Sequence, residues 1–352
     1  MSEVYFVFIK SAVLCVLLFL VGAPLARKLG WVDRPDARKC HDRPVPLIGG
    51  LVICCCLWCV LPYIGASSDI IRIAVLTSVL LIMGALDDLL CLSPQCRLIL
   101  QLLLVILLFH WAHVRLLEWA SFLGLHNLVG WIVIPVGMIF LVGYVNAFNM
   151  IDGLNGLAAS VALVQLLWLL IYAMALHNVE FSRLILIMMI WLGIFLMFNV
   201  GAFYQWRSQA FLGNAGSVFI GAWLAVLAIQ LSQSAGSTIY PITILWVLAH
   251  PLFDCLAVLL WRYHNKQPLY VAARDHVHHI LESILGARSA VLLMLLASSV
   301  LASIGYLLQL VQLEESLNWL CFISIFFCYQ LGILRMRGVI LHKKERKGKQ
   351  AL

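Results

Sequence analysis

The stretch Asn146-Ala-Phe-Asn-Met-Ile-Asp-Gly-Leu-Asn-Gly156 separates two apolar runs, residues 131–145 and residues 157–175. Each run is long enough to approach or cross a bilayer, because about 20 apolar residues span its hydrocarbon core. A connection that only reverses the chain does not need three asparagines and an aspartate. We therefore expect a site at the membrane surface for a charged, hydroxyl-rich ligand. The alternative is a polar helix end with glycine stops.

The spacing of the polar residues in this stretch suggests a shared surface. If Asn149 is helical, Asp152 and Asn155 follow on the same face, because residues three apart are neighbours on a helix. Gly153 and Gly156 would let a large group approach the backbone closely.

The composition is that of a membrane protein. Of 352 residues, 64% are hydrophobic and 11% are charged, and the mean hydropathy is +1.02. Soluble domains are about half apolar and a quarter charged. The apolar runs are long and continuous, which favours helices over a barrel. We expect an all-α, polytopic integral membrane protein that forms one domain, residues 1–352. Its eleven candidate spans lie at about 4–26, 47–64, 70–86, 98–114, 130–148, 156–176, 184–204, 215–231, 239–261, 289–310 and 316–334.

The basic residues predict the orientation of these spans. With the N-terminus outside, 19 of the 23 Lys and Arg residues fall in cytoplasmic segments, including a basic C-terminal tail. Lys10 lies within the first span, and the outer loops carry Arg72, Arg115 and Arg183. We expect a multi-pass membrane protein with its N-terminus outside and its C-terminus in the cytoplasm.

This orientation brings the polar segments to one side of the membrane. We expect catalytic loops on the cytoplasmic face at about 27–46, 87–97, 149–156, 205–217 and 262–288. A transporter more usually holds its polar groups near the bilayer midplane. Polar groups at the ends of spans favour an enzyme whose substrates meet at the inner leaflet.

A pair of aspartates, Asp87 and Asp88, closes the third span. Neighbours on a helix point about 100° apart, so the two carboxylates are suited to different tasks. Hard oxygen donors favour Mg²⁺, with Mn²⁺ as an option, and Mg²⁺ is usually bound through one or two carboxylates and substrate phosphates. The alternative is a polar helix end. Downstream, the glycine-flanked turn 211–217 opens the eighth span, where free N–H groups can hold an anion.

A histidine cluster lies in the longest inner loop, where Arg274 is followed by His276, His278 and His279. Zinc is one option, but no cysteine or fourth ligand is nearby, and contact with a phosphate or nucleotide fits better. Asp254 lies well inside a span, which makes it a functional candidate, although a structural pair with Arg262 is the alternative.

Several motifs occur together in a recognisable order. They are Val32-Asp-x-Pro, Pro46-x-x-Gly-Gly, Gly-Ala-Leu-Asp-Asp at 84–88, Asn-Ala-Phe-Asn-Met-Ile-Asp-Gly at 146–153, Gly-x-Ala-Gly-Ser at 213–217 and His-x-His-His at 276–279. Over residues 30–290 the chain resembles the polyprenyl-phosphate N-acetylhexosamine-1-phosphate transferases, nearest the bacterial WecA branch (undecaprenyl-phosphate GlcNAc-1-phosphate transferases). The family moves a sugar 1-phosphate from a UDP-sugar to undecaprenyl phosphate with release of UMP, requires Mg²⁺, and begins lipid-linked glycan synthesis, such as that of O-antigen.

The resemblance implies roles for individual residues. Asp87 would orient the lipid phosphate or receive its proton, Asp88 would support the metal, and Asp152 would organise the nucleotide-sugar site. Substrate contacts are expected from Asn146, Asn149, Asn155, Arg274, His276, His278 and His279, and metal ligation from Asp88 and Asn214. The expected partners are undecaprenyl phosphate, a UDP-N-acetylhexosamine and membrane lipids, with no nucleic acid; a homodimer stays open.

Three departures from the family pattern each remove an acid: Cys91, Asn155 and Asn214 stand where the family often has Asp. Asn214 bears most on function, because relatives use that carboxylate as a metal ligand; its alternative role is a helix N-cap. The alternatives for the whole chain are a silent member of the same fold and a membrane transporter. The sequence does not distinguish between hexosamines.

Overall fold

The computed structural model describes residues 2–35, 43–114, 129–202, 208–233, 239–269 and 274–350. Within these ranges the fold is helical apart from one two-stranded ladder, which confirms the all-α prediction. The elements are α1 (Ser2–Leu29), β1 (Val32–Asp33), β2 (Val45–Pro46), α2 (Gly49–Val60), the 3-10 turn η1 (Leu61–Tyr63), α3 (Ser68–Leu90), α4 (Pro94–His110), α5 (Val129–Met150), α6 (Leu157–Ala175), α7 (Val179–Asn199), α8 (Gly213–Ser232), α9 (Pro241–His264), α10 (Val277–Leu285), α11 (Ala287–Leu310) and α12 (Glu315–Gln350).

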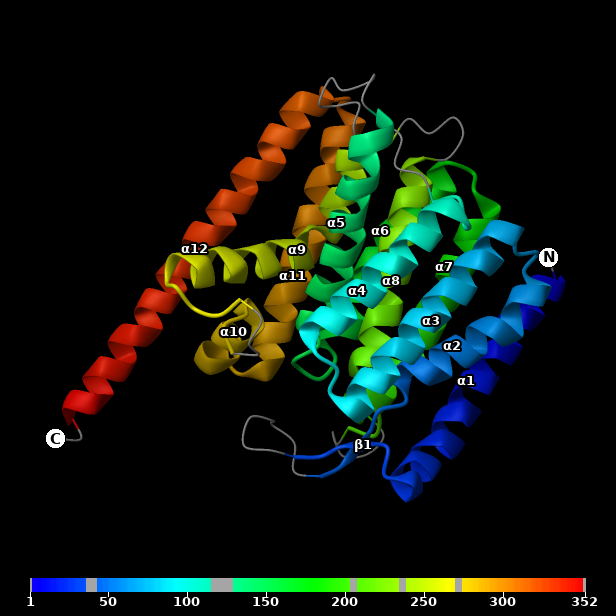
Figure 1. Cartoon of the computed structure of the whole chain (residues 1–352), viewed down its shortest axis with the longest axis horizontal. Coiled ribbons are helices and arrows are strands. Elements are labelled where there is room, and N and C mark those ends of the chain that lie inside the picture. Colours follow the sequence, from blue (N-terminus) through cyan, green and yellow to red (C-terminus); the bar gives the residue numbers. More distant parts are fainter. Residues whose placement is uncertain are drawn as a thin grey trace.

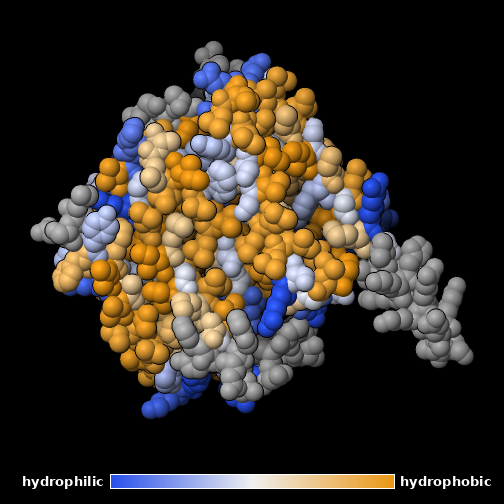
Figure 2. Space-filling model, turned by 180° about the vertical axis from the view of Figure 1, so that it is seen from behind, coloured by the Kyte–Doolittle hydropathy of each residue, from blue (hydrophilic) through white to orange (hydrophobic). Residues whose placement is uncertain are grey.

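Among the described helices, eight are long and apolar enough to cross a membrane: α1, α3, α6, α7, α8, α9, α11 and α12. Three shorter apolar helices cover residues 49–63, 94–110 and 134–150. Each expected span coincides with one of these helices, and an apolar surface covers much of the face in Figure 2. The multi-pass membrane class is therefore supported, while the count of eleven spans and the orientation stay predictions.

Helix α8 is the most enclosed of these eight helices, because 94% of the residues in its most apolar 18-residue stretch are buried. It packs against α2, α3, α5, α6 and α9 near the middle of the bundle, whereas α12 diverges along one side (Figure 1). Two close approaches require glycine. A Cβ added at Gly50 would lie 2.3 Å from the Cα of Gly216, and one at Gly84 would lie 2.6 Å from the Cα of Ala215. These glycines let α2 and α3 pack directly on the start of α8.

The two-stranded ladder and its neighbouring hydrogen bonds connect β1, the segment from β2 to the start of α2, and the segment before α8. β1 and β2 pair antiparallel, with Val32 opposite Pro46. The amide of Phe211 donates to the Pro46 carbonyl at 2.8 Å, and the amide of Gly49 donates to the Phe211 carbonyl at 2.9 Å. The segment before α8 is thereby held beside the start of α2, at the end of the bundle where β1 lies in Figure 1.

Two local expectations were wrong. α5 ends at Met150 and residues 151–156 form turns, so Asp152 and Asn155 do not continue a helical face from Asn149. The next helix, α6, begins after Gly156, whose φ of +83° lies in the left-handed region that favours glycine. The segment 87–97 is mostly helix rather than loop, because α3 runs to Leu90 and α4 begins at Pro94.

Candidate functional site

A cleft of about 1130 Å³ lies at this end of the bundle. The predicted convergence is confirmed for the described residues, since separated segments supply its walls. Its lining includes Val32, Asp33, Leu47, Asp87, Asp88, Cys91, Asn149, Asp152, Asn155, Asn199, Phe211, Gly213, Asn214, Arg274, His279, Glu282, Arg288, Val291, Leu292 and Leu295. One wall is polar, and the wall formed by α11 is largely apolar.

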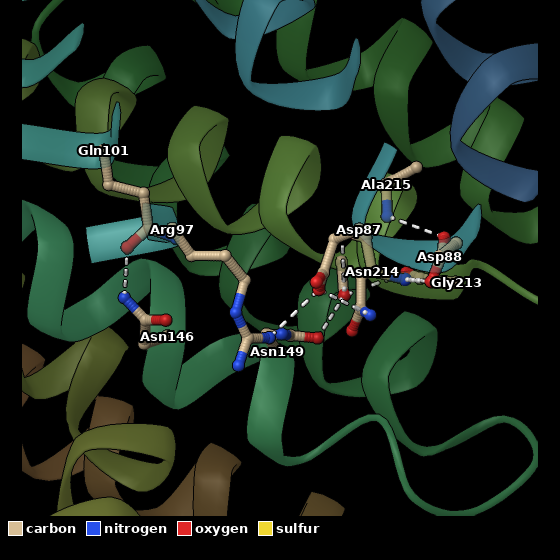
Figure 3. A network of polar contacts seen from close by, with 10 residues as sticks. Asp87, Asp88, Arg97, Gln101, Asn146, Asn149, Gly213, Asn214 and Ala215 are labelled. Atoms are coloured by element: carbon tan, nitrogen blue, oxygen red, sulfur yellow. Dashed lines mark hydrogen bonds and ion pairs between the residues drawn. The ribbon is translucent and has the colours of Figure 1, made fainter. Parts of the chain in front are cut away.

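Asp87, which lines the cleft, accepts hydrogen bonds from two side chains (Figure 3). Its Oδ2 accepts from Arg97 Nη1 and from Asn214 Nδ2, each at 3.0 Å. The Asp87 side chain is only 6% exposed, whereas that of Arg97 is 33% exposed. This carboxylate therefore fixes the end of α3 to α4 and α8, and presents a cation beside the cleft.

Asp88 binds the start of α8 (Figure 3). Its Oδ1 accepts from the backbone N–H of Asn214 at 3.0 Å, and its Oδ2 accepts from that of Ala215 at 3.2 Å. The sequence predicted that free backbone N–H groups at the start of this helix would bind an anion. In the structure, two of these groups bind the Asp88 carboxylate. The alternative role of Asn214 as the N-cap is wrong, because the cap residue is Leu212 and the capping carboxylate comes from Asp88. A Cβ at Gly213 would lie 2.6 Å from Asp88 Oδ2, so glycine is needed there.

The asparagines of the central stretch have different surroundings. Asn149 Oδ1 accepts from Ser217 Oγ at 2.7 Å, and Asn155 Nδ2 donates to Ser208 Oγ at 2.8 Å. Both line the cleft. Asn146 is not among the lining residues; its Nδ2 donates to Gln101 Oε1 and to the Val142 carbonyl. The structure therefore brings Asn149 and Asn155, but not Asn146, to the cleft.

Asp152 lies in the turn between α5 and α6 and lines the cleft. Enclosure by the surrounding protein, and secondarily the negative charge of Asp88, raise its pKa to about 7. Both carboxylates line the same cleft, and their negative charges repel each other. A cation bound between them would relieve this repulsion.

The histidine cluster belongs to α10, a nine-residue helix that sequence analysis did not predict. The helix start is held by Asp254, whose Oδ2 lies 2.8 Å from His276 Nδ1 and whose Oδ1 accepts from the Val277 amide at 2.9 Å. Arg262, the alternative partner of Asp254, forms an ion pair with Asp275 at 3.0 Å. Asp254 therefore positions α10.

Only one of the three histidines lines the cleft, namely His279. His278 is 1% exposed, both its ring nitrogens lack a hydrogen-bond partner, and its Nε2 would lie 2.4 Å from a Cβ at Gly153. Burial, followed by the neighbouring His279, lowers the pKa of His278 to about 3. His276 and His278 therefore do not line the cleft: His276 contacts Asp254, and the His278 ring packs against Gly153, where a side chain would not fit.

Several residues at the cleft were not singled out from the sequence. Glu282 Oε2 lies 2.9 Å from Arg274 Nη2 and 3.2 Å from His279 Nδ1, so it orients both. Asn199 accepts from the Gly156 amide at 2.6 Å and donates to the Ala210 carbonyl at 2.9 Å. In the sequence analysis Arg97 served only as one of the basic residues that predict the orientation of the spans. The i,i+3 spacing of His279 and Glu282 was a usable signal, but Asn199 gives none in a sequence.

The departures from the family pattern also have structural positions. Cys91 ends α3 with a φ of +51°, a left-handed position where Asp and Asn are enriched over most residues. Among the described residues, no group of three or more His, Cys, Asp or Glu side chains is arranged to hold a metal ion. Oxygen donors that line the cleft include the carboxylates of Asp33, Asp87, Asp88, Asp152 and Glu282, and the amides of Asn149, Asn155, Asn199 and Asn214.

Comparison with known proteins assigns the family. The family model described as glycosyl transferase family 4 matches residues 70–232, which include the aspartate pair, the central stretch and the start of α8. The chain is 32% identical to the undecaprenyl-phosphate alpha-N-acetylglucosaminyl 1-phosphate transferase of Pasteurella multocida (strain Pm70), over 91% of this chain and 90% of that protein. It is 30% identical to the enzyme of the same name from Escherichia coli (strain K12), over 92% of this chain and 90% of that protein. The chain belongs to the polyprenyl-phosphate N-acetylhexosamine-1-phosphate transferase family.

Proposed function

We propose that this chain transfers N-acetylglucosamine 1-phosphate from UDP-N-acetylglucosamine to undecaprenyl phosphate and releases UMP. In this reaction an oxygen of the lipid phosphate attacks the sugar-bearing β-phosphorus. The bond from that phosphorus to the bridging oxygen breaks, and the bridging oxygen leaves with UMP. Two relatives that align with nine-tenths of the chain carry the name of this activity, which favours it over a silent or transporting protein.

The observation that carries the proposal is the composition of the cleft. Carboxylates, amides and basic side chains lie on its polar walls, while Val291, Leu292 and Leu295 of α11 form an apolar wall beside them. Leu292 is 66% exposed. A polyprenyl phosphate needs both surfaces at once, because its chain must stay in lipid while its phosphate meets a nucleotide.

Basic residues at the cleft fit the charge of the substrates. The two substrates together bring several negative charges to one place, and their repulsion must be offset. Arg274 and Arg288 line the cleft, and Arg97 forms an ion pair at 3.0 Å with Asp87, which also lines it. In this assignment Arg274 and His279 meet the nucleotide diphosphate, and Glu282 fixes their orientation.

A divalent cation fits the oxygen donors. Asp88, Asp152 and Asn214 all line the cleft and place carboxylate and amide oxygens there, the kind of donor that Mg²⁺ prefers. Mg²⁺ usually binds through one or two carboxylates and substrate phosphates, so two carboxylates and one amide oxygen suffice. Bound there, Mg²⁺ (or Mn²⁺) would neutralise charge on the reacting phosphates. Asp87 then keeps Arg97 and Asn214 in place around the site.

A donor screen tests the proposed function. Purified protein in detergent would receive undecaprenyl phosphate, Mg²⁺ and radiolabelled UDP-GlcNAc, UDP-GalNAc or a modified UDP-hexosamine. We expect a labelled lipid product with UDP-GlcNAc and less with its epimer. If no donor gives a lipid-linked product, the proposal fails and a silent member of the fold is indicated.

The location of the reaction follows from the predicted orientation. The cleft would face the cytoplasm at the bacterial inner membrane, where nucleotide sugars are made, and the product would enter a lipid-linked glycan such as O-antigen.

A further inference from the structure

A second cavity, of about 610 Å³, lies between α1, the η1 end of α2 and the start of α7. Most of its lining is apolar, including Phe6, Leu14, Val60 and Ile64. The charged residues of the lining are Lys10 and Arg183, and no acidic residue is among them.

This cavity lies at the other end of the helices from the candidate site. Arg183 is in the second turn of α7, whereas Asn199, which lines the transferase cleft, is the last residue of α7. Sixteen residues of helix at 1.5 Å each separate them by about 24 Å. In Figure 1 the N-terminal end of α1 likewise lies away from the end that holds β1. Under the predicted orientation this is the periplasmic side.

The two cations of the cavity have no acidic partner in the described part of the chain. Lys10 lies over the ring of Phe6, 4.2 Å from its centroid, and neither Lys10 nor Arg183 forms an ion pair there. Arg72, at the same end of the bundle, is instead 3.0 Å from Asp69.

Both cations lie within helices long and apolar enough to span a membrane, because α7 begins at Val179 and so includes Arg183, which the sequence had placed in an outer loop. A cation in a spanning segment is costly unless an anion or water satisfies it. They also run against the positive-inside pattern, so topology does not explain them. Two cations beside apolar walls match an amphiphile with a phosphate head.

We propose that this cavity binds an anionic phospholipid of the leaflet opposite the transferase cleft. Its phosphate would lie between Lys10 and Arg183, and its acyl chains would cover the apolar lining. A soluble phosphate shares the head chemistry but would leave the apolar walls uncovered, so the lipid is the better occupant. The site is independent of the transfer reaction.

Native mass spectrometry of the detergent-solubilised full chain tests this proposal. The protein would be titrated with dioleoyl phosphatidylglycerol and, separately, with dioleoyl phosphatidylcholine. Each Lys or Arg near an anionic lipid contributes about a fivefold gain in binding. We expect Lys10→Gln and Arg183→Gln each to lower the phosphatidylglycerol preference about fivefold. Arg72→Gln, which removes a paired cation at the same end, is the matched control and should leave the preference within twofold of wild type.

Two outcomes would overturn the site. One is equal binding of the two lipids by the wild-type protein, a comparison that needs no variant. The other is the same loss of preference in Arg72→Gln as in the two cavity variants. Lys10→Arg, which keeps the charge, should retain the preference and so separates loss of charge from loss of fold. Displacement of phosphatidylglycerol by equimolar inorganic phosphate would indicate a soluble-anion site and contradict the lipid assignment.

Discussion

Changing Asn214 to aspartate replaces one proposed metal ligand and also breaks its hydrogen bond to Asp87. Asn214 Nδ2 donates to Asp87 Oδ2 at 3.0 Å, so a carboxylate at position 214 would face another carboxylate at that distance. At an effective dielectric constant of 20, two such charges repel by about 5 kcal/mol before relaxation. The lost hydrogen bond to a charged group costs about 1.5–3 kcal/mol more, while Arg97 offsets part of the repulsion. Because Arg97 and relaxation of the side chains should offset more than half of these two contributions, we expect Asn214→Asp without a divalent cation to lower the free energy of unfolding by about 2–4 kcal/mol.

Magnesium should reverse this loss, because a third carboxylate would bind the cation more tightly than an amide does. A ligand at a hundred times its dissociation constant stabilises the folded protein by about 2.7 kcal/mol. Thermal unfolding of Asn214→Asp in detergent should therefore shift upward with MgCl₂ more than that of the wild type. Its transferase activity should reach half its maximum at a lower Mg²⁺ concentration.

Asn155→Asp is the matched control for this change. Asn155 lies in the same cleft and its amide contacts a serine hydroxyl rather than a carboxylate, so we expect little loss of stability without Mg²⁺. The reasoning is refuted if Asn214→Asp keeps the wild-type stability, the wild-type Mg²⁺ dependence and the wild-type rate, since Asn214 would then not touch the metal.

Three further predictions concern the aspartate pair, pH and topology. Asp87→Asn and Asp88→Asn should each lower turnover by about 10²-fold or more in the radiolabelled-donor assay; normal activity in either removes that residue from the mechanism. His278, with its pKa lowered to about 3, stays neutral in the folded chain, whereas in the unfolded chain it takes up a proton below about pH 6.5. The free energy of unfolding should therefore fall by up to about 1.4 kcal/mol per pH unit as the pH drops from 6.5 towards 3. His278→Phe should weaken the dependence of the melting temperature on pH in this range, as measured by thermal unfolding. The same pH dependence in His278→Phe and the wild type would contradict the assignment. A cysteine replacing exposed Gln267, in a background without other accessible thiols, should react with an impermeant reagent only in inverted vesicles, and labelling of intact cells would reverse the orientation.

The spans could be predicted because a bilayer imposes one strong rule on sequence, a long apolar run for each crossing. The convergence of polar segments at one end followed from the alternation of spans. The task of Asp88 could not be predicted, because its backbone partners Asn214 and Ala215 are 126 and 127 residues away in sequence.

The errors in the sequence analysis have local physical causes. A helical face through Asn149, Asp152 and Asn155 failed because the chain leaves the helix after Met150 and Gly156 restarts it from a left-handed conformation. α10 was missed because its nine residues are too few for a clear period. Its position depends on Asp254, whose buried contacts with His276 and Val277 appear only when the chain is folded.

The most direct test of the proposed function follows the β-phosphate of the donor. UDP-N-acetylglucosamine labelled with ³²P at that phosphate would be incubated with the purified chain, undecaprenyl phosphate and Mg²⁺. Lipid and nucleotide pools would then be separated. Transfer of the sugar 1-phosphate predicts ³²P in the lipid pool and one unlabelled UMP for each labelled lipid formed. Label that remains in UDP while the sugar moves, or a lipid pool without label, would contradict the proposed function.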